Sequence, residues 1–277
     1  MERYKIQTPT CIFQLPFGLV LKRHQRVHEQ EGLAMNLARA MGVPAPRFLS
    51  FGSMPEGGRF SGSRKPVPSI LMTRVPGVPL DYFDPSQVDL DVVVADLTGI
   101  LARMRSFASP FGAAVCGAAG GDIRGPMIPA PPVAPFADEA AFIDHLREYV
   151  TTFDVDAVYD DRTPEQMEAL HTHFRARAVK VETRFFALPP HAIVFTHGDL
   201  NMQNIMIGPD GHVCGIIDWE AAAWLPEYWE VSVTAIMPML PWGKVMDKKV
   251  SEGVYEQEVE GHQALQAYVG MSYSYGL

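Results

Sequence analysis

Residues capable of acid, base and metal chemistry are concentrated between positions 194 and 220. This stretch reads VFTHGDLNMQNIMIGPDGHVCGIIDWE, and its polar residues of interest are His197, Asp199, Asn204 and Asp218. The apolar runs 205–207 and 213–217 flank a Gly-Pro-Asp-Gly turn, so they are predicted to pair as an antiparallel hairpin. Such a hairpin would return Asp218 to the residues between Asp199 and Asn204.

Two carboxylates and a carboxamide in one pocket are the set that phosphoryl transfer needs. Its transition state leaves the protein little covalent chemistry, so positioning and charge neutralisation dominate. Asp218 and Asn204 would offer hard oxygen ligands to Mg²⁺, and Asp199 would accept the proton of the attacking hydroxyl. The alternative is that the sequence from His197 to Asp199 is only a polar turn capping a buried strand.

The order and spacing of these residues resemble those of the aminoglycoside phosphotransferase and choline kinase family, especially its fungal members. Further segments resemble the family in the family's order: LPFGLVLK (15–22), EGLAM (31–35), ILMTRVPG (70–77) and LPEYWE (225–230). The resemblance implies an α+β, bilobal protein-kinase-like fold. A small, mostly antiparallel N-terminal lobe is expected over residues 1–75 and a larger, mainly helical catalytic and acceptor-binding lobe over 76–277. It also adds His197 to Asp199 as a candidate catalytic residue.

The N-terminal region offers a lysine and glutamate pair. Residues 11–22 are predicted to form two short strands with a bend, and residues 26–41 show helical spacing of apolar residues. By the resemblance, Lys22 on the second strand would hold the nucleotide phosphates and Glu31 on the helix would hold Lys22. Glu29 is a competing partner, and either glutamate could be a plain exposed helix residue.

Residues 47–52 and 69–74 are predicted to be two further strands, with a loop rich in Gly, Ser and Pro from 55 to 68. Residues 73–77 are similar to the interlobe hinge of the family, where backbone groups would bind adenine. The resemblance therefore makes Thr73 and Val75 candidate ATP-binding residues. An ordinary loop is the alternative.

The C-terminal region is predicted to be mainly helical, over 88–107, 138–153 and from a capping box at Thr163 to about Leu188. Residues 109–137 are predicted to be a functional flap or a poorly ordered insertion. Within them Asp122 and Arg124 resemble a family segment near the acceptor, although a turn with solvated charges explains them as well. Residues 219–230 and 250–273 would form a loop and one or two helices. In this region the carboxylates that could meet a cationic acceptor, or pin the loop, are Glu220, Glu227 and Glu230.

The sequence departs from the kinase pattern at its start. Kinases cover the phosphates with a glycine-rich loop, but residues 5–10 read KIQTPT, without glycine. The N-terminal lobe is therefore expected to be abbreviated, with the hydroxyls of Thr8 and Thr10 as possible replacements for some phosphate contacts. Nucleotide affinity is the property that this departure affects most.

Composition limits the partners and the location. The chain has 277 residues, of which 47% are hydrophobic and 20% charged, and a formal net charge of −9. This charge disfavours nucleic acid or an anionic membrane as a partner, and it suits a cationic small molecule, although a solvated acidic surface is the commoner reason. Three separated cysteines argue against a disulfide framework. The absence of a leader and of an 18-residue apolar run predicts a cytoplasmic protein.

The sequence thus predicts an ATP- and Mg²⁺-dependent phosphotransferase acting on a hydroxyl of an aminoglycoside-, choline- or amino-alcohol-like molecule. One alternative is a non-catalytic nucleotide-binding or interaction protein that keeps the kinase fold. Another is a kinase-fold enzyme of different nucleotide-dependent chemistry. The sequence does not indicate an oligomeric state.

Overall fold

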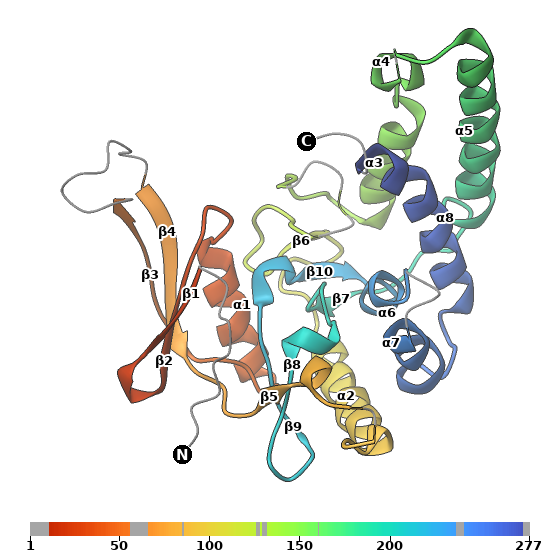
Figure 1. Ribbon diagram of the computed structural model, residues 1–277. Coiled ribbons are helices and arrows are strands. Elements are labelled where there is room, and N and C mark those ends of the chain that lie inside the picture. The colour runs from red at the N-terminus through yellow and green to blue at the C-terminus, as the bar shows by residue number, and fades with distance from the viewer. Residues whose placement is uncertain are drawn as a thin grey trace.

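The N-terminal lobe is an antiparallel sheet with one helix packed against it (Figure 1). The computed structural model describes residues 11–55, 66–84, 86–125, 128, 132–159, 161–236 and 241–273. The sheet has the order β1-β2-β4-β3, and its strands are β1 (Ile12–Leu15), β2 (Leu19–Arg23), β3 (Phe48–Pro55) and β4 (Pro66–Thr73). Helix α1 (Glu29–Ala40) lies between β2 and β3 in the chain and buries Ala34, Met35 and Ala38.

These elements confirm the predicted strands and helix of the N-terminal lobe, with wider bounds for β3 and β4. The turn between β1 and β2 is Pro16–Gly18, where Phe17 has a φ of 62° and Gly18 a φ of 70°. Because glycine adopts positive φ without steric cost, Gly18 suits this tight reversal. Thr8 and Thr10 lie outside the described residues, as do the other positions where kinases have a glycine-rich loop.

After β4 the chain crosses to the second lobe and joins a three-stranded sheet. Strand β5 (Val78–Pro79) pairs with β8 (Ile205–Ile207), which pairs with β9 (Val213–Ile216). The predicted hairpin is therefore present. A third sheet contains β6 (Cys116–Gly117), β10 (Ala223–Pro226) and β7 (Ile193–Thr196), in that order.

Helices make up the remainder of the C-terminal lobe. They are α2 (Leu90–Arg105), α3 (Glu139–Thr151), α4 (Val155–Val158), α5 (Pro164–Arg184), α6 (Trp229–Thr234), α7 (Pro241–Val245) and α8 (Glu256–Tyr273). Both hydrogen bonds of the capping box predicted at Thr163 are present, and α5 ends at Arg184, earlier than expected. Figure 1 shows α3, α4, α5 and α8 at the end of the molecule away from the N-terminal sheet. Among the described residues, no helix has the length and apolarity to cross a membrane.

The described part of residues 109–137 is folded into the C-terminal lobe. It contributes β6 and two isolated bridges, which join Val115 to Phe136 and Ile123 to Val133. The side chains of Val115, Ile123 and Ile128 are buried in the core that also holds α3 and α5. The described residues therefore do not form the poorly ordered insertion that their composition suggests.

Candidate active site

Asp199 lies on a loop that follows β7, and the loop bends at Gly198. Gly198 has a φ of 80°, and a Cβ there would lie 2.5 Å from the carbonyl oxygen of Ala221. No other residue type fits this position without a shift of the backbone. The bend points the chain back toward β8, and the Asp199 side chain is left at the surface of a cavity.

His197 stabilises this loop from within the core. The residue is 1% exposed, and its ring packs edge-on against Trp219, with ring centroids 4.7 Å apart. The Asp199 N–H donates to His197 Nδ1 at 3.2 Å, and Nε2 donates to the Ile217 carbonyl at 2.9 Å. These partners require a neutral ring protonated on Nε2, and burial lowers the pKa of His197 to about 4. Although His197 was expected among the catalytic residues, it lines neither of the two cavities described below.

Glu230 of α6 holds the same loop from the other side. Its side chain is 2% exposed and accepts hydrogen bonds from the backbone N–H groups of His197 and Gly198. Burial raises the pKa of Glu230 to about 7, against the opposing effect of these hydrogen bonds. Glu230 is thus part of the loop's support.

The β8–β9 hairpin places Asn204 and Asp218 beside Asp199. The Ile217 N–H donates to the Asn204 carbonyl at 2.9 Å, and Asn204 Nδ2 donates to the Asp199 carbonyl at 2.8 Å. Asp218 follows β9 with a left-handed backbone, φ 63° and ψ 65°. Aspartate tolerates this conformation better than most residues. It turns the chain into the 3₁₀ segment η4 (Trp219–Ala221).

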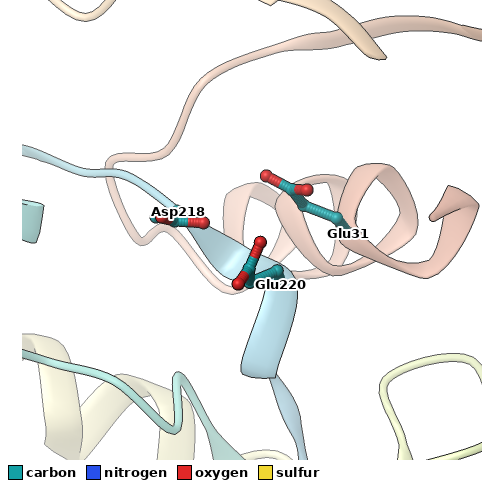
Figure 2. A group of neighbouring side chains, drawn as sticks. All are labelled: Glu31, Asp218 and Glu220. Atoms are coloured by element: carbon teal, nitrogen blue, oxygen red, sulfur yellow. The ribbon is translucent and has the colours of Figure 1, made fainter. Parts of the chain in front are cut away.

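Lys22 lies among three carboxylates that come from separate parts of the chain. Its Nζ is 3.0 Å from Glu31 Oε1, 2.6 Å from Asp218 Oδ1 and 2.9 Å from Glu220 Oε2. Figure 2 shows the carboxylates of Glu31 on α1, Asp218 and Glu220 turned toward one another. Burial alone would lower the pKa of Lys22, but the three carboxylates outweigh it and raise the pKa.

Glu31, not Glu29, is the carboxylate of α1 that meets the lysine. Glu31 is 0% exposed, whereas Glu29 faces solvent. A buried carboxylate without a partner would be strongly unfavourable, so the ion pair explains how Glu31 can occupy this position. The side chains of α1 and β2 are thereby fixed relative to each other.

One cavity of about 230 Å³ lies between the lobes. Apolar side chains from both lobes line it, namely Ile12, Val20, Met72, Met206 and Ile217. Lys22, Glu31, Asn204 and Asp218 also line it, as do Thr73 and Val75 from the predicted hinge. An apolar cavity with a few charged groups is typical of small-molecule and cofactor sites.

A second cavity, of about 530 Å³, lies on the other side of Asp218. Asp199, Gln203 and Glu220 line it together with Arg26, His28 and Arg124. Asp218 belongs to the walls of both cavities, whereas Lys22 lines only the first and Asp199 only the second. A group bound in the first cavity can therefore meet a group bound in the second beside Asp218.

The ionisation of Asp199 follows from its surroundings. Burial, and next the repulsion of the Asp218 carboxylate, raise the pKa of Asp199 to about 6. Hydrogen bonds from Asn201 and Asn204 act in the opposite direction. A carboxylate with a pKa close to neutral is a better proton acceptor than an ordinary aspartate.

Asp218 and Asn204 fit a Mg²⁺ ion by their chemistry. Both line the first cavity, and they supply a carboxylate and a carboxamide oxygen, the hard ligands that Mg²⁺ prefers. The Asp218 side chain is 39% exposed, so it is open to a ligand, unlike Glu31, whose side chain is 0% exposed. Asp218 and Asn204, and not the Glu31 carboxylate, are therefore suited to hold the ion.

The sequence did not indicate several of the residues that line the second cavity. Gln203 lies within the motif, but nothing in its type or spacing indicates a role. Arg26 and His28 precede α1, and only the fold brings them to Glu220, where His28 Nε2 donates to the Glu220 carbonyl at 3.1 Å. Arg124 was a weak candidate on resemblance alone, and the structure places it in this cavity, while Asp122 faces solvent.

Comparisons with known proteins agree with this architecture. A thermostable apo mutant of aminoglycoside phosphotransferase APH(4)-Ia is 14% identical, with a TM-score of 0.61 over 95% of this chain and 84% of that one. A ternary complex of a thermostable APH(4)-Ia variant with ADP and hygromycin B has a TM-score of 0.60 at 14% identity, over 95% and 84% of the two chains. The GDP and kanamycin complex of APH(2")-IIia has a TM-score of 0.54 at 16% identity, over 92% and 78%. These likenesses confirm the predicted kinase-like fold.

Sequence comparison assigns the family. No curated protein matches the chain. The profile of the phosphotransferase enzyme family, APH, matches residues 3–267, which is almost the whole chain. The protein therefore belongs to the phosphotransferase enzyme family.

Proposed function

We propose that this protein transfers the γ-phosphoryl group of ATP to a hydroxyl group of a small molecule. The observation that carries the proposal is the position of Asp218 in the walls of two cavities. One cavity has the lining of a nucleotide site, and the other contains a carboxylate suited to accept a proton. Direct transfer between two substrates needs such an arrangement, because both must lie in line at one point.

Each residue has a separate part in this proposal. Lys22, held by Glu31, binds the nucleotide phosphates, and its raised pKa keeps it charged. Asn204 and Asp218 would hold Mg²⁺, and the ion would supply neutralisation of the charge on the phosphates. Asp199 accepts the proton of the attacking hydroxyl.

His197 and Glu230 serve as positioning residues in this scheme. Both bind the loop of Asp199 through its backbone, and His197 also ties that loop to Ile217, next to Asp218. A neutral buried imidazole with both nitrogens engaged has no proton to exchange with a substrate. The effect of His197 on the reaction is therefore exerted through the placement of Asp199.

The hinge supplies the proposed contact with the base of ATP. The Thr73 N–H donates to the Arg47 carbonyl at 3.0 Å, and the Arg74 N–H donates to the Gly18 carbonyl at 2.7 Å. Pro76 has no N–H. We therefore assign the adenine contact to the backbone of Val75, which lines the first cavity.

The small-molecule acceptor is the part of the proposal that rests on the second cavity. Aminoglycoside-, choline- and amino-alcohol-like acceptors follow from the family resemblance, by which Glu220, Glu227 and Glu230 could either meet a cationic acceptor or pin the loop. Glu230 supports the loop instead, and Glu227 Oε2 accepts from the Tyr255 hydroxyl at 3.3 Å. These contacts leave the hydroxyl group as the part of the acceptor that the proposal specifies.

Nucleotide binding is the first test. ATP with Mg²⁺ should raise the thermal midpoint of the wild type above that with Mg²⁺ alone, because a ligand that binds only the folded state stabilises it. Asp218→Asn should remove most of this metal-dependent rise, and asparagine tolerates the left-handed backbone at this position. Asp161→Asn on the exposed surface is the control and should behave as wild type. An equal rise in Asp218→Asn would contradict the assigned metal ligand.

The mass of the product identifies the chemistry. Incubation with ATP, Mg²⁺ and a panel of hydroxylated molecules should give an acceptor with one added phosphate. An acceptor carrying AMP, or one that has lost water, would show instead a kinase fold with different nucleotide chemistry. ATP binding without any product across the panel would favour a non-catalytic protein.

The pH dependence of the reaction should reflect Asp199. A base must be deprotonated to act, and burial and Asp218 raise the pKa of Asp199 to about 6. Since kcat/KM follows groups of the free enzyme, it should fall as the pH drops through 6 and be about tenfold lower at pH 5 than at pH 8. A profile that stays flat from pH 8 down to pH 5 would show that Asp199 is not the titrating base.

A further inference from the structure

The second cavity is lined by basic as well as acidic residues. Arg26, His28 and Arg124 face it from two separate segments of the chain. Its acidic residues are Asp199, Asp218 and Glu220. The partners that each of these groups already has decide which charges are available to a ligand.

Two of the three carboxylates are already engaged. Asp218 Oδ1 is 2.6 Å from Lys22 Nζ, and Glu220 contacts both Lys22, at 2.9 Å, and Arg26, at 3.7 Å. Asp199 accepts from Asn201 and Asn204, and its place is at the reacting hydroxyl. Among the described lining residues, Asp199 is thus assigned to the reacting hydroxyl, Asp218 to Lys22 and the proposed metal ion, and Glu220 to Lys22 and Arg26.

Arg124, unlike these carboxylates, has no partner for its charge among the described residues. Its Nε is buried without a hydrogen-bond partner, and among the described residues no carboxylate forms an ion pair with its guanidinium. The neighbouring positions 126, 127 and 129–131 are Pro, Met, Pro, Ala and Pro, so their side chains add no charge. A buried guanidinium nitrogen without a partner is costly unless a ligand satisfies it.

His28 adds an acceptor atom to the same wall. Its Nε2 donates to the Glu220 carbonyl, and its Nδ1 is buried without a partner. Burial, and next the charge of Arg124, lower the pKa of His28 to about 4. The neutral ring therefore presents a lone pair that can accept a hydrogen bond from a hydroxyl group.

We propose that the acceptor carries an anionic oxyacid group, a carboxylate or a phosphate, which the Arg124 guanidinium binds, in addition to the hydroxyl that is phosphorylated. A guanidinium presents parallel N–H donors that match the two oxygens of such a group. An acceptor with an ammonium group there would instead meet an uncompensated positive charge. The inference rests on the proposed function for the statement that this ligand is the acceptor.

The test compares polyols that differ in one terminal group. One series is glycerol, glycerate, glycerol 3-phosphate and 3-amino-1,2-propanediol. The other is sorbitol, gluconate, sorbitol 6-phosphate and glucamine. Calorimetric titration of each into the full chain gives the dissociation constant without requiring turnover, and comparing carboxylate with phosphate separates the two anionic groups.

In at least one series, the carboxylate or the phosphate should bind about 10- to 100-fold more tightly than the neutral polyol, as expected for a charge-assisted bidentate contact. The amine should bind no more tightly than the neutral polyol. Arg124→Gln should bring the anionic probe to the affinity of the neutral one, and Arg124→Lys should restore part of the difference. Arg103→Gln removes the same charge from the exposed face of α2 and should leave all affinities unchanged.

Three results would overturn the inference. The first is the absence of an anion preference in both series, including the absence of binding by every anionic probe. The second is a preference that folded Arg124→Gln retains. The third is an equal loss of ATP–Mg²⁺ affinity in Arg124→Gln, which would assign the guanidinium to the transferred phosphate. Binding of anionic probes through Arg124 without any phosphorylated product would contradict the proposed function alone.

Discussion

Asp199→Asn should lower kcat by about 10²- to 10⁴-fold, the range that a positioned general base contributes, while the protein stays folded. Asparagine has the shape of aspartate, and its side-chain oxygen can still accept from Asn204 Nδ2, while its NH₂ group can donate to Asn201 once the Asn201 amide flips. It cannot accept the proton of the attacking hydroxyl. Steady-state assay with a phosphorylated acceptor, together with circular dichroism of the variant, measures both effects.

Nucleotide binding separates the loss of the base from damage to the site. Because Asp199 does not line the first cavity, Asp199→Asn should bind ATP–Mg²⁺ within about twofold of wild type. Asp210→Asn in the exposed β8–β9 turn is a matched control and should keep full activity. Full turnover by Asp199→Asn would refute the assigned mechanism.

Glu230→Ala should be the most destabilising of the substitutions considered, by about 2 to 5 kcal/mol in the free energy of unfolding. It removes a buried acceptor and leaves the backbone N–H groups of His197 and Gly198 without partners in the core. The same change should lower kcat, because those two residues lead directly into Asp199. Urea denaturation and steady-state kinetics give the two quantities.

Glu227→Ala is the control for this loss, since Glu227 lies one turn away and its carboxylate binds only the Tyr255 hydroxyl among the contacts found for it. It should cost less than about 1 kcal/mol. Glu230→Gln should retain most of the stability, because the raised pKa of Glu230 shows that burial disfavours its charge and an amide oxygen can still accept. Equal stability of Glu230→Ala and Glu227→Ala would show that the loop does not depend on this carboxylate.

Local patterns were sufficient to predict the parts of the fold that chemistry depends on. The turn and the flanking apolar runs predicted the hairpin of β8 and β9, and this hairpin alone brings Asn204 and Asp218 near Asp199. The lysine at the end of β2 and the glutamate early in α1 were predicted from spacing and resemblance, and the fold joins them in an ion pair. Helical spacing likewise predicted α2 and α3, and the capping box at Thr163 predicted α5.

Long-range packing accounts for what the sequence did not indicate. Strand β10 has four residues, Ala-Trp-Leu-Pro, whose sequence alone does not indicate a strand. They form a strand because they pair with β6 on one side and β7 on the other. The sequence left two roles open for Glu230, contact with a cationic acceptor or pinning of the loop, because the burial that favours the second is decided by α6 and its neighbours. Arg124 is separated from Arg26 and His28 by about a hundred positions, and no local rule relates it to them. Contacts made across the fold therefore set the properties of the second cavity.

The left-handed backbone of Asp218 also gives a criterion for interpreting related sequences. Glycine and asparagine adopt this conformation at least as readily as aspartate, so the turn after β9 does not by itself require a carboxylate. Selection on folding alone would let the three residues replace one another over evolutionary time. A negative charge retained here is explained by its partners, Lys22 and the proposed metal ion. In descendants that abandoned phosphoryl transfer, we expect glycine or asparagine to accumulate at this position while the surrounding core persists.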